Sequence, residues 1–281
     1  MRKTIFIFLV CAAASALPVS SGADTAGGFD RHFRYHSADG PVMLYSDISD
    51  EFTKNHARHA RLVWDYYHRI FSRPPGNRII LYYTKDQKLY DKILKRYPTI
   101  TMEGARQVTA NWTGKYREWF IIPYTTPDYG TQLHEISHDF LYFTCPESEN
   151  FPWFKEGSAM YYESGSFRAD GNLIVARPLP SYHQLFRDWA EKRQLIPLGT
   201  LLRMERNEFY HADYTKTYSQ SMIFFFYLAE RHPETLKKVF SGINERKIRS
   251  GSVLMEYIIR SAGKNVTAME REYIDYGNTT R

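Results

Sequence analysis

Apolar and polar residues follow different patterns in the two halves of the chain. Short apolar runs at 42–45 and 79–83 predict β-strands, the second of them Ile-Ile-Leu-Tyr-Tyr. Between these runs, apolar residues recur at helical spacing over residues 51–71, which predicts an amphipathic helix. The first half is therefore expected to mix α and β structure.

A hairpin is expected at the end of this half. Residues 106–112 and 118–123 have the composition of strands, and they flank Thr-Gly-Lys at 113–115, which is typical of a turn. The sequence therefore predicts an antiparallel pair that leads into the second half.

After residue 130 the helical spacing dominates, and we expect only helices and loops. The predicted helices cover 130–143, 153–164, 182–193, 214–231 and 233–241, with two more towards the C-terminus. No internal repeat or long Pro/Gly linker divides the chain after residue 29. We therefore expect one α+β domain over 24–281, with a sheet-bearing lobe at 24–129 and a mainly helical lobe at 130–281.

Composition narrows the class of protein. The chain has 281 residues, of which 43% are hydrophobic and 24% charged, so a sizeable core is expected. A mean hydropathy of −0.50 excludes a polytopic membrane protein. Only two cysteines are present, Cys11 and Cys145, so disulfides cannot hold this fold together.

The N-terminus has the features of a secretory signal. Arg2 and Lys3 precede an apolar run at 5–14 and small-residue cleavage sites, so residues 1–23 are predicted to be a signal peptide. Removing them leaves 35 basic and 31 acidic residues without a dense basic cluster, which argues against nucleic acid as a partner. We expect a secreted or periplasmic protein that does not stay inserted in a membrane.

The candidate chemistry begins at residues 134–138, His-Glu-Ile-Ser-His. On a helix, His134 and His138 project from one face, so both imidazoles can reach a single Zn²⁺. Glu135 lies beside them and is expected to act as a general base towards water. The alternative that both histidines serve only as core or capping residues does not explain the intervening Glu.

A hydrolytic zinc site needs a third protein ligand and an open position. Downstream, residues 152–163 predict a second helix that packs against the first, and Glu156 near its start can point at the same metal. The alternative is that Glu156 only complements the helix dipole.

These two segments together resemble the gluzincin branch of the zincin metallopeptidases. Residues 153–159, Trp-Phe-Lys-Glu-Gly-Ser-Ala, are similar to the W-x-x-E-G-x-A segment of the aminopeptidase-type gluzincins and of the peptidase MA-like families. The resemblance implies a zincin-like fold with an active-site cleft between the lobes, a Zn²⁺ cofactor, and Glu156 as the third ligand. Seventeen residues separate His138 from Glu156, one fewer than in the aminopeptidases.

The resemblance also implies roles outside the two helices. Tyr218, at the start of an apolar helix, corresponds to the tyrosine that stabilises the oxyanion, with Tyr214 one turn earlier as its competitor. An edge strand would pair with an extended substrate, and its candidate residues are Gln107, Val108, Thr109, Ala110, Asn111 and Trp112. The Gly-x-Met-Glu-Asn signature that holds a substrate's α-amine is absent, so endopeptidase action is as well supported as exopeptidase action.

Other polar residues have weaker assignments. Asp139 and Glu163 are candidates to hydrogen-bond a ligand histidine, with solvated positions as the alternative for each. The remaining histidines, including His183, His211 and His232, are expected at the surface or in loops, and Cys145 is expected to be a buried thiol.

The sequence as a whole predicts a secreted zinc-dependent metallopeptidase whose substrate is a peptide or protein. The rival hypothesis is a non-catalytic protein of this fold that acts as a binding or envelope-assembly module. Glu135 argues against it, because a protein that only binds has no need of a general base.

Overall fold

The computed structural model describes residues 30–70, 79–94, 110–113, 118–121 and 129–280. The predicted signal peptide lies outside these residues, as do Gln107, Val108 and Thr109 of the predicted substrate strand. The first part of the chain contains η1 (Asp30–His32), β1 (Tyr35–Asp39), β2 (Val42–Ser46), α1 (Asp50–Ile70), β3 (Ile79–Tyr83), α2 (Gln87–Leu94), β4 (Ala110–Thr113) and β5 (Glu118–Ile121).

The described strands of this part form one mixed sheet in the order β1-β2-β3-β5-β4. β1 and β2 are antiparallel, and Gly40 between them has a φ of +57°, which a glycine adopts without strain. β2 and β3 are parallel, joined by a crossover that contains α1. β5 runs parallel to β3 and antiparallel to β4, so the predicted hairpin is confirmed and β4 forms an edge of the sheet.

The apolar patterns of this part are explained by burial. All five residues of β3 are buried, which explains its continuous apolar run, whereas β2 alternates between buried and half-buried positions. α1 packs on β1 and β2 through a buried face that includes Ala60, Val63 and Tyr67. β1 and α2 were not predicted, because their apolar patterns are short and weak.

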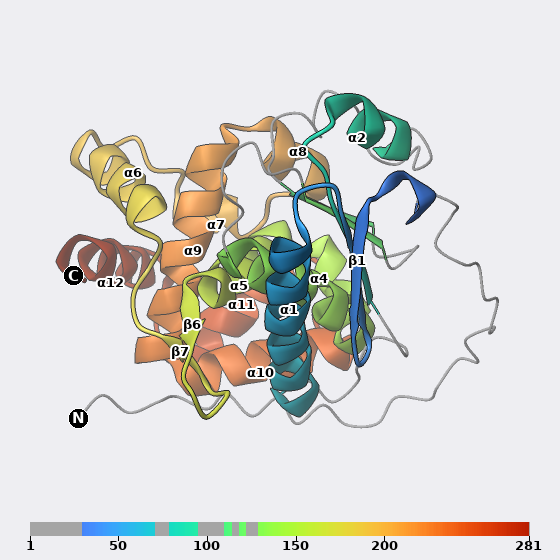
Figure 1. Cartoon of the computed structure of the whole chain (residues 1–281). Helices are drawn as coiled ribbons and strands as arrows, with labels where there is room; N and C mark the ends of the chain where they lie inside the picture. Colours follow the sequence, from blue (N-terminus) through green and yellow to red (C-terminus); the bar gives the residue numbers. More distant parts are fainter. Residues whose placement is uncertain (1–29, 71–78, 95–109, 114–117, 122–128, 281) are drawn as a thin grey trace.

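The second part is mainly helical. It contains α4 (Tyr129–Thr144), η2 (Pro146–Asn150), α5 (Pro152–Glu163), α6 (Pro180–Glu191), α7 (Leu198–Leu201), α8 (Arg206–His211), α9 (Tyr214–Arg231), α10 (Pro233–Asn244), α11 (Gly251–Ala262) and α12 (Val266–Thr279). The five predicted helices are all present, and α9 has the predicted bounds. In Figure 1, β1 lies on one side of α4 and α5, and α9, α6 and α12 lie on the other, while α1 lies in front of α4 and α5.

Two expectations for this part are wrong. We expected no strands after residue 130, but β6 (Gly165–Phe167) and β7 (Leu173–Val175) form a small antiparallel hairpin after α5. These strands have three residues each, too few for an alternating pattern to be visible in the sequence. His183 is not at the surface: it is buried on α6, and its Nε2 lies 2.6 Å from the carbonyl oxygen of Gly277.

The largest helix contacts are those of α5 with α9 and of α4 with α5. α5 is buried from Pro152 to Met160, and α9 is buried almost throughout its last three turns. Among the described residues, no helix is both long and apolar enough to cross a membrane. The mixed α+β class and the order of sheet and helices are therefore as predicted, and a stack of three helices, α4, α5 and α9, forms the centre of the second part.

Candidate metal centre

Helix α4 holds the two motif histidines in a fixed orientation. Its residues Leu133, Ile136 and Phe140 are buried in the core, and the phenol of Tyr67 on α1 donates a hydrogen bond of 2.8 Å to the carbonyl oxygen of Leu133. Packing by α1 on one side turns the opposite side of α4 towards α5. His134 and His138 lie on that side, one helical turn apart.

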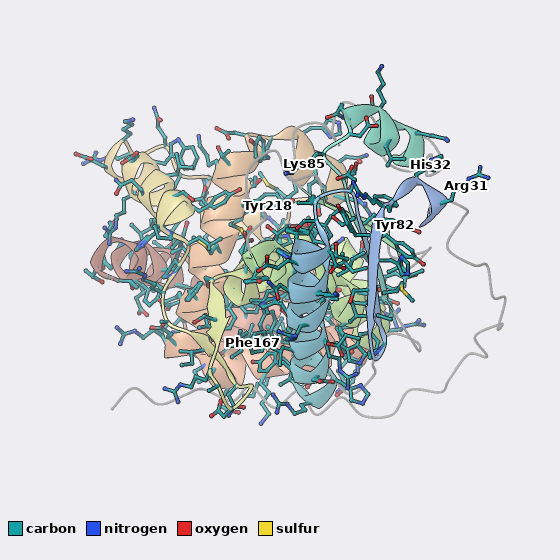
Figure 2. All side chains as sticks on the ribbon, viewed as in Figure 1. Arg31, His32, Tyr82, Lys85, Phe167 and Tyr218 are labelled. Atoms are coloured by element: carbon teal, nitrogen blue, oxygen red, sulfur yellow. The ribbon has the colours of Figure 1, made fainter. Side chains whose placement is uncertain are left out.

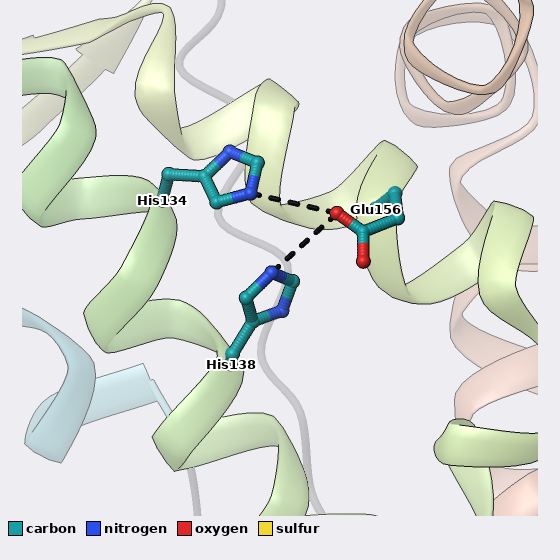
Figure 3. A group of neighbouring side chains, drawn as sticks. All are labelled: His134, His138 and Glu156. Carbon is teal, nitrogen blue, oxygen red and sulfur yellow. Dashed lines mark ion pairs between the residues drawn. The ribbon is translucent and has the colours of Figure 1, made fainter. Parts of the chain in front are cut away.

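Glu156 on α5 meets both histidines, as Figure 3 shows. Its Oε2 lies 3.5 Å from Nε2 of His134 and 3.5 Å from Nε2 of His138. Glu156 belongs to the second turn of α5, beyond the reach of the helix-dipole effect, and its carboxylate faces the histidines. The interpretation of Glu156 as a dipole partner is therefore wrong.

The spacing of these atoms fits a tetrahedral metal ion. Ligand atoms that bind one zinc ion at 2.0–2.1 Å with tetrahedral angles lie about 3.4 Å from each other. The ligand atoms of His134, His138 and Glu156 all lie within 4.8 Å of one another, and no other such group of His, Cys, Asp and Glu occurs among the described residues. Two imidazoles and one carboxylate form a donor set suited to zinc, with a position left for water.

Glu163 orients the first histidine. Its Oε2 lies 2.7 Å from Nδ1 of His134, a distance at which this ring nitrogen can donate a proton to Glu163 while Nε2 faces Glu156. Glu163 is the last residue of α5, two turns beyond Glu156. The predicted hydrogen bond between Glu163 and His134 is therefore present, and the role of His134 as a metal ligand stays a prediction.

Glu135 is buried beside the triad but does not belong to it. Burial raises the pKa of Glu135 to about 7; the nearby His134 lowers it, and the charges of Glu156 and Glu163 raise it further. A carboxylate with a pKa near neutrality can both accept and return a proton, as a general base requires.

The charges around the three converging residues are strongly coupled. Burial alone would lower the pKa of His134, but the adjacent Glu156 and Glu163 raise it well above its usual value. Burial lowers the pKa of His138 to about 4, which keeps this imidazole neutral. Burial alone would raise the pKa of Glu156, but His138 and His134 hold it well below the usual value, so the carboxylate is ionised. The centre thus offers an anionic oxygen and attracts a cation.

The close packing of α9 against α5 brings Tyr218 towards the centre. A Cβ atom added to Gly157 would lie only 2.7 Å from the backbone oxygen of Ser221, so the glycine after Glu156 allows the two helices to approach. Figure 2 shows Tyr218 towards the middle of the molecule, far from Arg31 and His32 at its edge. Burial, followed by the charge of Glu156, raises the pKa of Tyr218 well above its usual value. Its competitor Tyr214 is 42% exposed.

Tyr210 on α8 contacts Glu156, and the sequence did not predict this contact. Its phenol donates a hydrogen bond of 2.5 Å to Oε1 of Glu156, and its ring centroid lies 6.5 Å from that of Tyr218. No motif marks Tyr210, because α8 has only six residues. Only the tertiary fold brings α8 next to the candidate metal centre.

The predicted substrate strand is only partly described. Ala110, Asn111 and Trp112 lie on the edge strand β4, which contacts the motif helix α4. Its position beside the motif helix is compatible with pairing to an extended peptide.

The remaining polar assignments have mixed outcomes. Asp139 is fully buried, so the solvated alternative is wrong, while its partnership with a ligand histidine stays a prediction. Cys145 is a buried thiol, as expected. His211 is exposed at the end of α8, whereas His232 is half-buried and its Nε2 lies 2.9 Å from the Tyr227 phenol.

Comparison with models of protein families and with curated protein sequences found no match for this chain. The function is therefore inferred from the residues and geometry of the candidate metal centre.

Proposed function

We propose that this chain is a zinc-dependent metallopeptidase of gluzincin type, with a zincin-like fold, that hydrolyses peptide bonds. The observation that carries the proposal is the convergence of His134, His138 and Glu156, with Glu135 buried beside them and outside the ligand set. A site that only bound metal would need the three ligands but not the additional carboxylate.

Each residue has a distinct task in this proposal. A zinc ion held by the triad would supply Lewis acidity and lower the pKa of water to about 7. Glu135 accepts a proton from the attacking water on a carboxylate oxygen and passes it to the leaving amine. Tyr218 donates a hydrogen bond to the oxyanion that develops on the substrate carbonyl.

Pairing with the edge strand β4 fixes the direction in which an extended peptide substrate runs past α4. An extended peptide that adds to this edge forms main-chain hydrogen bonds and lies next to α4, where its scissile bond can reach Glu135. This mode of binding places little demand on the ends of the substrate. It therefore supports action within a peptide as much as at its end.

Two measurements separate a peptidase from a binding module of the same fold. The first is the zinc content of the purified protein: about one equivalent supports the proposal, and less than about a tenth, with no gain on adding Zn²⁺, supports the binding module. The second is digestion of a peptide library, with Glu135→Gln as the inactive variant. Glu256→Gln is the matched control, because Glu256 is an exposed residue of α11 that pairs with the exposed Arg260.

We further infer that the protein is exported and that residues 1–23 direct it. N-terminal sequencing of protein recovered from the periplasm or medium of a bacterial host tests this inference. A mature chain that begins near residue 17 or 24 supports it, and full-length protein confined to the cytoplasm contradicts it.

A further inference from the structure

The two oxygens of the Glu156 carboxylate have different partners. Oε2 faces the two histidines at 3.5 Å, and Oε1 accepts the 2.5 Å hydrogen bond from Tyr210. Glu156 is only 4% exposed, so water cannot satisfy its oxygens freely. The phenol of Tyr210 therefore supplies a hydrogen bond that the buried carboxylate needs.

Packing and polar contacts hold helix α8, which carries Tyr210, beside the candidate metal centre. Phe209 anchors it in the core, and the guanidinium of Arg206 lies 5.9 Å from the centroid of the Tyr210 ring. Arg206 also lies 3.5 Å from Glu149, which pairs at 2.9 Å with the buried Lys155, the residue before Glu156. The helix thus contacts the chain next to Glu156 as well as Glu156 itself.

We propose that Tyr210 is a positioning residue that restrains Glu156 to bind the metal through Oε2 alone. This proposal rests on the metal site of the proposed function. With Oε1 engaged by Tyr210, the carboxylate cannot rotate to present both oxygens to one ion, and a position stays open for water or substrate. The same bond holds Oε2 towards the histidines before any metal arrives, so less freedom is lost on binding.

In this proposal the phenols of Tyr210 and Tyr218, both near Glu156, have different roles. Tyr210 acts on the ligand and determines metal affinity and coordination. Tyr218 acts on the substrate and determines the rate of turnover. Removing each hydroxyl should therefore change a different measurement.

The test compares three Tyr→Phe variants of the full chain. Tyr210→Phe and Tyr218→Phe each remove one phenol near the centre, and Tyr227→Phe is the matched control, because Tyr227 donates a 2.9 Å hydrogen bond to Glu272 at the other end of α9. Zinc affinity is measured by competition with a chromophoric chelator, and the visible spectrum of the Co²⁺-substituted protein reports the coordination. Urea unfolding of the metal-free proteins reports their stability.

We expect Tyr210→Phe to weaken zinc binding by about 10- to 100-fold and to change the Co²⁺ spectrum, because partners of ligand residues typically have effects of this size. Tyr227→Phe should keep the wild-type affinity within about threefold, and Tyr218→Phe, whose phenol also lies near Glu156, should lose less affinity than Tyr210→Phe. Arg206→Gln is a second variant that does not threaten the fold, since its side chain is 65% exposed, and it should weaken zinc binding by about two- to fivefold.

The possible results separate this inference from the proposed function. If the wild-type protein binds no zinc, both are overturned. If it binds zinc and Tyr210→Phe keeps the wild-type affinity and Co²⁺ spectrum, only the role of Tyr210 is overturned. An equal loss of affinity in Tyr227→Phe would also overturn it, since the effect would then not depend on contact with Glu156.

Discussion

Helices α1 and α4 pack against each other, and each carries a pair of histidines at helical spacing. His56 and His59 are three residues apart on α1, and His134 and His138 are four residues apart on α4. Burial is the largest single influence on the pKa of His59, of His134 and of His138. Only the α4 pair is a metal-site candidate, so spacing and burial alone do not define such a site.

The first difference is the hydrogen-bond partner of Nδ1 in His59 and in His134. Nδ1 of His59 lies 2.6 Å from the amide oxygen of Gln132, whose amide nitrogen donates to the Tyr83 phenol. Nδ1 of His134 lies 2.7 Å from a carboxylate oxygen of Glu163. A carboxylate on the ring N–H makes the imidazole a stronger metal ligand than a neutral amide does.

The second difference is what the rings face. On α1, the ring of His56 stacks on Phe52 at 3.8 Å and that of His59 stacks on Tyr129 at 4.2 Å. On α4, both imidazoles face the carboxylate of Glu156. The comparison teaches that an acid from a second helix turns two histidines into a cation site, and that aromatic neighbours leave them as part of the packing.

The largest predicted effect comes from the residue after the first histidine, which is Glu135 on α4 and Ala57 on α1. Glu135→Gln preserves shape but cannot accept a proton, so turnover should fall by about 10²- to 10⁴-fold while zinc content and fold are unchanged. Peptide hydrolysis and zinc analysis of the same preparation measure this. A variant with more than about a tenth of wild-type activity would show that Glu135 is not the base.

The second-largest effect is predicted for Tyr218, whose phenol lies near the α4 histidines. If Tyr218 binds only the oxyanion, Tyr218→Phe should lower kcat by about 10²- to 10³-fold and leave KM nearly unchanged. Tyr214→Phe is the matched control, because Tyr214 lies one turn earlier on α9 and is 42% exposed. A loss confined to Tyr214→Phe would move the role to that residue.

Removing the acid should make the α4 pair resemble the α1 pair. Glu156→Ala leaves two imidazoles without an anionic ligand, so zinc affinity should fall by more than about 100-fold, beyond the typical effect of an outer partner. Competition with a chelator measures the change. Unchanged affinity would mean that a different carboxylate completes the site.

These differences explain what the sequence could predict. The convergence of these three residues was predictable because His134 and His138 lie on one helix with fixed spacing, and the W-x-x-E-G-x-A resemblance marks Glu156. The strands and helices with strong periodicity, such as α1, β3 and α9, were predictable for the same reason: each pattern is local.

Contacts between distant segments were not predictable where no motif or spacing marks the residues. Tyr210 is one of 22 tyrosines, and only the path of the chain through α8 brings it to Glu156. His183 was expected at the surface because no local pattern shows that α12 covers α6. The short strands β6 and β7 were missed because pairing, and not periodicity, defines them.

Changing the partner of His134 tests the first difference directly. Glu163→Gln replaces the carboxylate on Nδ1 with an amide, which is the arrangement of His59 and Gln132. Zinc affinity should fall by about 10-fold, with the metal still bound at saturating zinc. Titration with zinc and a competing chelator measures this, and a full loss of binding would instead make Glu163 a direct ligand.

Substitution in the α1 histidine pair is predicted to have the smallest effect on zinc binding. Its main effect is on the stability of the fold. Burial lowers the pKa of His59 to about 4, although its hydrogen bond with Gln132 opposes the shift. In the unfolded chain the pKa is about 6.5, so between these values the unfolded state binds a proton that the folded state does not. The contribution of His59 to the free energy of unfolding should therefore fall as the pH drops through this window, by about 2 to 3 kcal/mol between pH 7 and pH 4.5.

The variant His59→Gln isolates this contribution, because it keeps a polar side chain and removes the titrating ring. Urea unfolding of the metal-free proteins at pH 7 and pH 4.5 should show a smaller loss of stability on acidification in the variant than in the wild type. The difference between the two losses is the contribution of His59, since the other buried histidines titrate in both proteins. At neutral pH the variant should bind zinc like the wild type, because the triad is intact. Equal losses on acidification would show that His59 is not held neutral, and weakened zinc binding would show that the two histidine pairs are not separate.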